Sequence, residues 1–442
     1  MLEKIIFKKV HLWIVLLLFI FFLIGAVLFS SMVRHVATGG LLLGKWTPLI
    51  ENVAKFPGKI IYLFRSNAMK VDPQIADTDA DRSLKILNKK YFDANEDGYL
   101  LVSTYDYENG SFILLYSLKE DKEIYRWIPP IKEIHDQAPD FKDGINSFRY
   151  YRSQHPLLMN NGDVIFSSGE GPLVRLSKCN EIKWIIPEIF HHSNQKHNNE
   201  DLIYAVKRLK KNESNKLIYD DGYAVINANS GTQLEEYSVE KILLQNEKNL
   251  GIIYGIGDHE RDRYHVNQVY PVTISDEYVQ KDDVFISIRN LSMVVLYRPA
   301  ENKIIWQSVG PWINQHDVRY LGNGKISVFG NNVVRGLDKN FEFLLGHSDI
   351  YIYDISNDTY SLPFTKVMKS SKQRSGGIFK LLSNGDGFSE LSSDMIVKRF
   401  NKEEVIWEYV HYLGNSKKGN LNWTRYLDKS DVNLENLNNG CK

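Results

Sequence analysis

A repeated pattern of short strands, beginning near residue 92, restricts the fold of this chain more than any other feature of its sequence. Each unit contains a polar turn with Gly or Asp, two apolar or alternating strands, and a closing aromatic residue after an apolar pair. Tryptophans close four of these units, and weaker tyrosine closings fill the two longer gaps; the closing residues are Trp127, Trp184, Tyr237, Trp306, Tyr360 and Trp407. A unit of this size cannot bury both faces of its sheet alone, so the units must pack against one another.

The repeats predict an all-β fold, a six-bladed β-propeller over residues 92–430. Seven or eight blades are the alternatives in number, and a pair of β-sandwiches is the alternative in architecture, although sandwiches do not require recurrent closing tryptophans. Almost no window in this region sustains a helical period with caps. Because an open ring would leave two bare sheet edges, residues near 92–127 and 376–407 are expected to be neighbours.

The segment before the repeats is predicted to hold one transmembrane helix. Residues 1–34 contain Lys4, Lys8 and Lys9, followed by an uncharged apolar run from Leu12 to Phe29 that is close to the length needed to cross a bilayer. A cleaved signal peptide is the alternative, but its apolar core is usually shorter. The lysines predict a single-pass protein of the inner or plasma membrane, with a cytoplasmic N-terminus and an extracytoplasmic, periplasmic propeller.

Composition narrows the remaining organisation. Residues 35–91, with a mixed segment at 59–65, are predicted to be a stalk or linker, and residues 431–442 a C-terminal tail. The 54 basic and 54 acidic residues balance, so no electrostatic argument favours a nucleic-acid partner. Cys179 and Cys441 are the only cysteines. They lie so far apart in sequence that two unpaired thiols are expected, with a disulfide as the alternative.

Histidines recur at the start of the innermost strand in four successive units. His265 opens the triplet His265-Val266-Asn267, and His316 is the centre of Gln315-His316-Asp317; the corresponding places in the second and third units hold His155 and the pair His191-His192. In a propeller, these strand entrances surround the central funnel, so residues distant in sequence meet there. A lone histidine near a strand start is usually a turn or capping residue, and His155 fits that description best.

A cluster of this composition suggests oxyanion chemistry. Arg289 lies near the end of a strand predicted over residues 285–290, between the His265 and His316 triplets. Two imidazoles and a guanidinium would bind an oxyanion and leave one imidazole as a nucleophile. Zinc is the other interpretation of three histidines, but no H-x3-H spacing is present and an arginine would oppose a dication, so no metal is predicted.

The same stretch resembles a known family. The motifs H-V-N, S-I-R-N, I-I-W and Q-H-D-V, followed by L-G-N-G-K-I, look like the core of the bacterial aryl sulfotransferases, which move sulfate between phenols without a nucleotide donor. The resemblance implies that His316 is the transiently sulfated nucleophile, that His192 and His265 support it, and that Arg289 binds sulfate. It implies no cofactor. One departure is the sequence Gly330-Asn331-Asn332, where the family commonly has an acidic residue and glycine.

Two functions follow as expectations. The first is an enzyme that transfers a sulfuryl group from a small-molecule aryl sulfate to a phenolic acceptor by a ping-pong route through His316. Residues expected to contact substrate are Asn267, Gln315, Asp317 and His191. The second is a non-catalytic, membrane-anchored propeller that binds protein or carbohydrate in the cell envelope. An intact cluster of cationic groups favours chemistry, because burying such groups together carries a desolvation cost.

Overall fold

A computed structural model describes most of the chain in two separate units, residues 1–72 and 73–442. The described residues are 11–37, 44–47, 49–50, 53–54, 56–57, 74–77, 96–141, 150–197, 201–213, 216–255, 262–335, 341–438 and 441. The first unit contains the helix α2 (Leu12–Ala37) and the 3-10 turn η1 (Gly44–Trp46). The segment Leu12–His35 is long and apolar enough to cross a membrane, and a signal sequence has the same features. The mixed segment at 59–65 lies outside the described residues.

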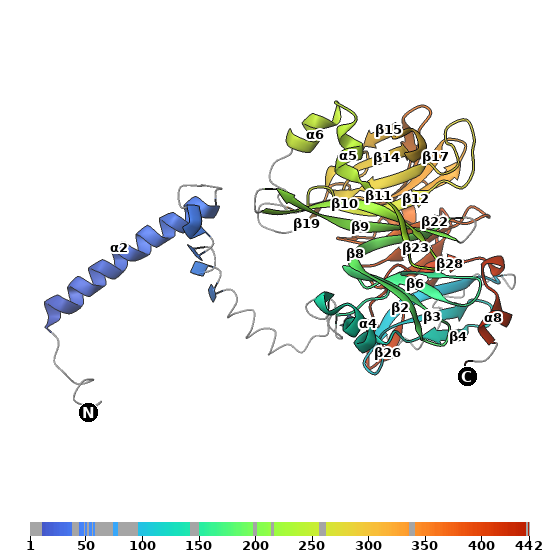
Figure 1. The fold of residues 1–442 in the computed structure, drawn as a ribbon, viewed down its shortest axis with the longest axis horizontal. Coiled ribbons are helices and arrows are strands. Elements are labelled where there is room, and N and C mark those ends of the chain that lie inside the picture. Colours follow the sequence, from blue (N-terminus) through green and yellow to red (C-terminus); the bar gives the residue numbers. More distant parts are fainter. Residues whose placement is uncertain are drawn as a thin grey trace. The chain divides into compact units, whose positions relative to one another are not determined.

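The second unit is all-β and propeller-like, with short antiparallel sheets arranged next to one another (Figure 1). Four sheets have four strands each, joined in chain order except where the last strand returns to the first sheet. The first is β28 (Arg425–Leu427), β2 (Tyr99–Asp106), β3 (Gly110–Ser117) and β4 (Lys122–Trp127); another is β12 (Val266–Pro271), β13 (Val284–Ile288), β14 (Met293–Arg298) and β15 (Lys303–Val309). The others are β16 (Val318–Gly322), β17 (Lys325–Gly330), β20 (Asp349–Asp354) and β21 (Thr359–Ser361), then β22 (Ile378–Leu381), β23 (Gly387–Leu391), β24 (Ile396–Phe400) and β25 (Val405–Tyr409).

The predicted count of six separate blades needs correction, because four separate four-stranded blades are found. The second and third predicted units merge into one seven-stranded sheet of β5 (Gln154–Leu158), β6 (Val164–Ser167), β7 (Gly171–Leu176), β8 (Ile182–Lys196), β9 (Leu202–Glu213), β10 (Lys216–Asn227) and β11 (Gln233–Ser238). The cause is the long strand β8. Its first half pairs with β7, as in Trp184 opposite Arg175, and its second half pairs with β9, as in Gln195 opposite Tyr204.

The ends of the second unit are joined by strand pairing. Near the C-terminus, β28 lies beside β2, with Leu101 opposite Arg425. One hydrophobic core also combines Leu100 and Phe112 of this sheet with Phe388 and Trp407 of the β22–β25 sheet. The segments near 92–127 and 376–407 are therefore neighbours, as predicted for a closed ring.

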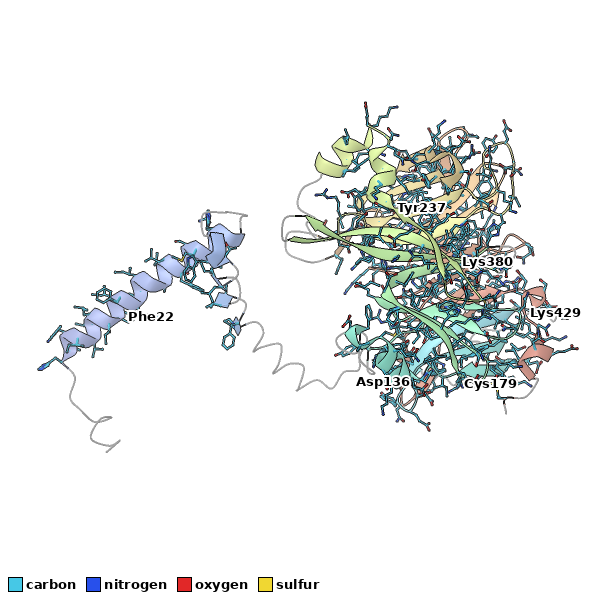
Figure 2. The ribbon with its side chains drawn as sticks, in the orientation of Figure 1. Phe22, Asp136, Cys179, Tyr237, Lys380 and Lys429 are labelled. Atoms are coloured by element: carbon cyan, nitrogen blue, oxygen red, sulfur yellow. A yellow bond between two sulfur atoms is a disulfide. The ribbon has the colours of Figure 1, made fainter. Side chains whose placement is uncertain are left out.

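The closing aromatic residues of the repeat occupy equivalent places. They fall on the last strand of each predicted unit, and they are Trp127 in β4, Trp184 in β8, Tyr237 in β11, Trp306 in β15, Tyr360 in β21 and Trp407 in β25. Trp127 and Trp407 are fully buried, so they fill the space between adjacent sheets. Figure 2 shows the side chains that fill the second unit.

Short elements decorate the sheets. The small sheets are β1 (Ile75–Asp77) with β27 (Lys417–Gly419) and β26 (Tyr412–Gly414), and β18 (Val333–Arg335) with β19 (Phe341–Phe343). The helices are α4 (Ile131–Gln137), α5 (Val239–Leu244), α6 (Asn249–Gly255), α7 (Thr365–Met368) and α8 (Leu434–Asn438), and the 3-10 turns are η2 (Pro139–Phe141), η4 (Arg289–Leu291), η5 (Pro299–Glu301) and η6 (Lys429–Asp431). Because β1 pairs with β27, residues 75–77 of the predicted linker belong to the propeller-like unit.

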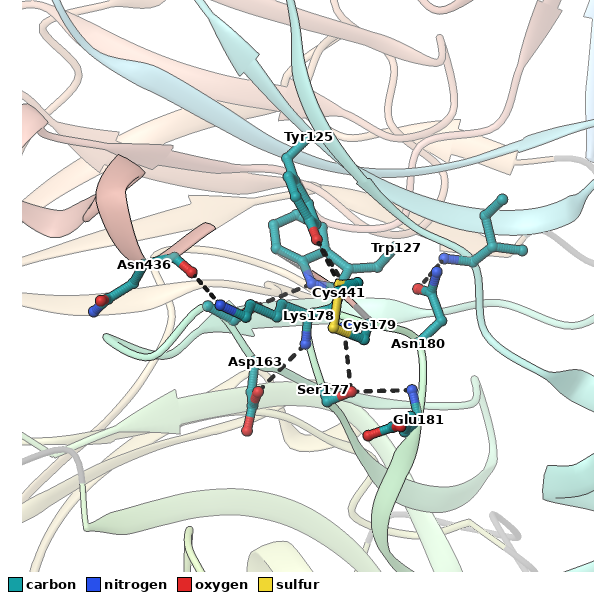
Figure 3. Close-up of a disulfide and its surroundings, with 12 residues drawn as sticks. Tyr125, Trp127, Asp163, Ser177, Lys178, Cys179, Asn180, Glu181, Asn436 and Cys441 are labelled. Atoms are coloured by element: carbon teal, nitrogen blue, oxygen red, sulfur yellow. Dashed lines mark hydrogen bonds between the residues drawn. A yellow bond between two sulfur atoms is a disulfide. The ribbon is translucent and has the colours of Figure 1, made fainter. Parts of the chain in front are cut away.

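The expectation of two unpaired cysteines is wrong, because Cys179 and Cys441 form a disulfide across 262 residues of sequence (Figure 3). Cys179 lies in the turn between β7 and β8. The predicted C-terminal tail packs onto the same region, where Leu437 joins a core cluster and the main-chain oxygen of Asn436 accepts a hydrogen bond from Lys178 Nζ at 2.6 Å. Folding therefore brings together two cysteines that sequence distance separates.

Candidate active site

The four residues predicted to be catalytic line one cavity. This histidine cavity has a volume of about 450 Å³, and its walls include His192, His265, Arg289 and His316. The ring centroid of His192 lies 5.0 Å from that of His265 and 6.1 Å from that of His316. Residues from three different sheets thus converge, as the repeat predicted.

Local backbone geometry turns these side chains toward the cavity. His192 lies inside β8 where the register with β9 shifts, and its φ is +56°. His265 precedes β12 and has φ +50°. Non-glycine residues rarely adopt this left-handed conformation, so the rest of the fold must hold it in place. The backbone of His316 is more regular, and its N–H donates to the carbonyl of Phe329 at 3.0 Å.

Both ring nitrogens of His316 have a defined partner. Asn331, just after β17, donates from Nδ2 to the carbonyls of Gln373 and Gly376 at 3.0 and 2.9 Å. Its Oδ1 must therefore face His316 Nδ1, which lies 2.7 Å away and carries the proton. His316 Nε2 is then the unprotonated nitrogen, and it accepts the N–H of Gly376 at 2.9 Å. Asn331, the departure from the family pattern, thus sets the tautomer.

His316 is held in its neutral form. Burial and the nearby charge of Arg289 lower its pKa well below the usual value. Burial is also the first cause of a lowered pKa at His192, with contributions from the neighbouring histidines. A neutral imidazole keeps its lone pair, so His316 Nε2 is nucleophilic at neutral pH.

His192 is connected through His191 to the carboxylate of Asp221. The Nδ1 atoms of His192 and His191 lie 2.7 Å apart, so one ring donates to the other. His191 Nε2 lies 3.5 Å from Asp221 Oδ1, and both residues are buried. His191 thus contacts a carboxylate on one side and a predicted catalytic residue on the other. It also lines the mouth cavity, a space of about 330 Å³ shared with His192 and His265.

His265 forms a carboxylate pair of its own. Its Nδ1 lies 2.5 Å from Asp262 Oδ2. Burial raises the pKa of Asp262, but the hydrogen bond and charge of His265 outweigh this and lower the pKa overall. Asp262 is therefore ionised at neutral pH and makes a short contact with the ring of His265.

The carboxylates of this region share one arginine. Arg208 approaches Asp221 at 3.2 Å and Asp262 at 3.5 Å. Ligand atoms of Asp221, Asp262 and His265 lie within 4.8 Å of one another, as a metal site would require. The donor set does not fit a metal ion well, because the guanidinium of Arg208 already supplies positive charge to both carboxylates.

Arg289 follows β13 in the turn η4 and lines the histidine cavity. Its Nη1 donates to Asn290 Oδ1 at 2.9 Å. Burial lowers the pKa of Arg289, and the charge of Asp262 raises it in part, so the guanidinium stays cationic at neutral pH. Its planar donors can contact two oxygens of one oxyanion.

Three residues expected to contact substrate do not line the histidine cavity. Asn267 Nδ2 donates to the carbonyl of Gln315 at 2.9 Å, and Gln315 Nε2 donates to the carbonyl of Met293 at 2.9 Å. Asp317 Oδ2 accepts from Arg319 Nε at 2.8 Å. These side chains are buried between strands and hold His265 and His316 at their positions. His155 is also internal, with Nδ1 accepting the N–H of Asn194 at 3.1 Å.

Several residues that the sequence did not single out line the cavity. Arg152 lies at its mouth, exposed, and makes no hydrogen bond or ion pair within the described part of the chain. Trp423, with φ +68°, forms the floor, and its ring packs edge-on against His192 and His316 at centroid distances of 5.6 and 6.2 Å. Arg152 precedes His155 at a strand entrance, which is a weak signal. Trp423 has none, because it follows the last recognised repeat.

Solved structures resemble this chain only distantly. A protein of unknown function from Bacteroides caccae shares 9% identity with a TM-score of 0.46, covering 75% of this chain and 100% of that chain. The periplasmic gluconolactonase PpgL of Pseudomonas aeruginosa shares 9% identity with a TM-score of 0.42, covering 75% and 99% respectively. Likenesses this weak carry no argument about function. No curated protein matches the chain significantly.

The family comparison is more informative. The profile described as arylsulfotransferase (ASST) matches residues 155–411, which is more than half of the chain. The match includes His192, His265, Arg289 and His316. The chain therefore belongs to the arylsulfotransferase family.

Proposed function

We propose that this protein transfers a sulfuryl group from an aryl sulfate ester to a phenolic acceptor, with His316 as the transient carrier. The observation that supports this most is the fixed tautomer of His316, whose unprotonated Nε2 belongs to a residue that lines one cavity with Arg289. A purely structural histidine would gain nothing from the charge of Arg289, which only destabilises the protonated form of its ring. A nucleophilic histidine gains from that charge, because it must stay neutral.

In the first half-reaction, His316 Nε2 forms a bond to sulfur while the bond between sulfur and the aryl oxygen breaks. Arg289 contacts the equatorial oxygens, where negative charge is spread in the transition state. His265, paired with Asp262, donates a proton to the leaving phenolate. The hydrogen bond from the Gly376 N–H to Nε2 must break before the attack. The freed N–H can then donate to a sulfuryl oxygen.

In the second half-reaction, a phenol oxygen attacks sulfur and the N–S bond breaks. His265 takes the phenol proton and so returns to its initial state. Asn331 is an amide and cannot remove the proton from His316 Nδ1, so the sulfated ring stays cationic. A cationic ring is a better leaving group than a neutral one, which favours transfer over a dead-end adduct.

The remaining residues have supporting roles in this proposal. His192 lines the histidine cavity beside His316, and His191, which contacts Asp221, lines the mouth cavity next to it. Arg152 at the mouth attracts the sulfate ester, while Asn267, Gln315 and Asp317 position the strand entrances. No observation favours the non-catalytic binding module, which would gain nothing from this cluster.

We further propose that α2 is a membrane anchor and that the propeller-like unit lies outside the cytoplasm. The supports are the length and apolarity of Leu12–His35, the lysines before it, and the disulfide between Cys179 and Cys441. We also infer that the seven-stranded sheet fills the place of two predicted units joined through β8, since Trp184 and Tyr237 occupy equivalent closing positions.

The direct test is a transfer assay with the full chain in detergent. A chromogenic aryl sulfate is mixed with a panel of phenols, and both phenol release and sulfated acceptor are measured. We expect release that depends on acceptor, with ping-pong kinetics. No release with any donor and acceptor pair, from protein that remains folded, would contradict the proposal.

A further inference from the structure

A second cavity lies behind Trp423, between the innermost strands of several sheets. This arginine cavity has a volume of about 240 Å³; its lining includes Leu157, Gln195, Tyr270, Arg319, Phe388 and Arg425. Trp423 lines the histidine cavity but not this one, whereas the next residue, Thr424, lines this one alone. The two cavities are therefore on opposite sides of the Trp423 backbone, and the second has no part in the proposed transfer.

The lining carries an excess of positive charge. Its charged side chains are Lys196, Arg319, Lys380, Arg425 and Asp431. Lys380, labelled in Figure 2, pairs with Asp428 at 2.9 Å. Arg319 Nε contacts Asp317 at 2.8 Å. That carboxylate is the only ion-pair partner of Arg319 within the described residues.

Arg425 has no carboxylate partner among the residues that the structure describes. It donates from Nε to the carbonyl of Pro156 at 2.6 Å and from Nη1 to Gln195 Oε1 at 3.2 Å, and Nη2 bonds the carbonyl of Asn194. These neutral acceptors satisfy its geometry but carry no charge, and only the more distant carboxylate of Asp317 offsets part of its charge. Arg319 and Arg425 consequently repel each other across the cavity.

Three residues that line the arginine cavity carry hydrogen-bond donors without a partner among the described residues. The Nη1 and Nη2 groups of Arg319 and the hydroxyl of Tyr270 have no hydrogen-bond partner within the described ranges. Gln195 is only 7% exposed. Its Oε1 accepts a hydrogen bond from Arg425, which fixes the orientation of the amide, and its Nε2 has no hydrogen-bond partner in the described part of the chain. Gln195 Nε2 is a buried donor without an acceptor, which is rare and costly, and Arg319 and Tyr270 line the same cavity with donors of their own.

We propose that the arginine cavity binds one small oxyanion, either inorganic sulfate or a compact organic carboxylate. Arg319 contacts it through Nη1 and Nη2, Tyr270 and Gln195 donate to it, and Arg425 supplies attraction from close by. The apolar side chains of Leu157, Ile378 and Phe388 in the same lining fit the body of an organic acid. An anion there would balance the charge of two arginines and would help to join strands from separate blades.

Calorimetry on the full chain in detergent tests this. Sodium sulfate and sodium benzoate are titrated at constant ionic strength against the wild-type protein and against Arg289→Gln, which removes anion binding at the histidine cavity. The same titrations use Arg319→Gln and the milder Tyr270→Phe, both in the Arg289→Gln background. Lys380→Gln, which removes a lining charge that is already paired, is the matched control. Crystals soaked in selenate give the position of the anion directly.

We expect one site to remain in Arg289→Gln, to weaken by about tenfold or more in Arg319→Gln, and to weaken by a few-fold in Tyr270→Phe. Lys380→Gln should bind as before, and a selenium peak should lie beside Arg319. The better of the two ligands identifies the source of the oxyanion. Absence of binding in Arg289→Gln, or binding that Arg319→Gln and Tyr270→Phe leave intact, overturns the proposal. Failure of aryl sulfate transfer would not affect these measurements.

Discussion

At the scale of single residues, the chemistry depends on how the two ring nitrogens of His316 are distinguished. Asn331 fixes the proton on Nδ1, and the Gly376 N–H faces Nε2. Arg289 and burial keep the ring neutral. His265 differs, since its Nδ1 lies 2.5 Å from a carboxylate oxygen of Asp262 and not beside an amide. In the proposed mechanism, these two histidines have opposite tasks, nucleophile and proton donor.

Replacing Asn331 with Leu should slow transfer by about tenfold to hundredfold, because one buried hydrogen bond and the tautomer it fixes are lost. Asn331→Asp keeps an acceptor at this place but adds a negative charge that favours the imidazolium. Its rate should fall mainly at acidic pH. Steady-state kinetics between pH 5 and pH 9 would check both variants, and a Leu variant with the wild-type rate would show that Asn331 does not control the tautomer.

Arg289→Gln should change both rate and pH dependence. Losing an oxyanion contact of this kind costs about 3 kcal/mol, or roughly a hundredfold in rate. The charge of Arg289 also lowers the pKa of His316, so its removal raises that pKa. The ring is active when neutral, and activity is lost as pH falls through its pKa. The acid limb of the pH profile should therefore move to higher pH.

Lys402→Gln is the matched control for this experiment, since it removes an exposed cation from the turn between β24 and β25. Its profile should overlay that of the wild type. An acid limb that stays in place in Arg289→Gln would mean that Arg289 does not influence His316.

At the scale of elements, periodicity predicted where strands begin and end because alternation reflects burial of one sheet face. It placed His265 and His316 correctly near strand entrances, but the same prediction is wrong for His191 and His192, which lie inside β8. It failed at β8, where Pro187 and the pair His191-His192 would normally end a strand. Here the chain continues from one predicted unit into the next. Asn331 and Trp423 were missed because their roles arise from contacts between distant segments, which no local pattern contains.

The disulfide cross-links the C-terminal segment to the turn after β7. Cys179→Ser with Cys441→Ser should lower the free energy of unfolding by about 2–4 kcal/mol, because the unfolded chain loses a cross-link. Denaturant midpoints measured with and without reductant would show this. Reductant should destabilise the wild type only, and the double variant should transfer sulfate as before. Equal midpoints for both proteins in the absence of reductant would contradict a stabilising role.

At the scale of the whole molecule, we propose that α2 anchors the enzyme in a membrane. The propeller-like unit, with its disulfide, would then lie outside the cytoplasm. The helix α2 exposes apolar side chains along its length, which water does not favour. The disulfide requires a compartment in which thiols oxidise. Both features support the proposal that the histidine cavity lies outside the cytoplasm.

Topology can be tested through the same two cysteines. In cells acid-quenched before lysis, maleimide should label the protein only after reduction, because the thiols are paired outside the cytoplasm. Protease added to intact spheroplasts should digest the propeller-like unit, and the protein should remain in the membrane fraction after a high-salt wash. Free thiols in untreated cells, together with full protection from protease, would overturn this topology.

Trapping the covalent intermediate is the most direct test of whether His316 carries the sulfuryl group. Full-length protein is mixed with an aryl sulfate in the absence of acceptor, quenched rapidly at alkaline pH, digested and analysed by mass spectrometry. We predict one sulfuryl group, on the peptide that contains Gln315-His316-Asp317, and its disappearance on addition of a phenol. His316→Ala should show neither adduct nor transfer, whereas His347→Ala, which alters a histidine paired with Asp349 outside the cavity, should show both. An adduct on another residue, or transfer by His316→Ala, would contradict the account.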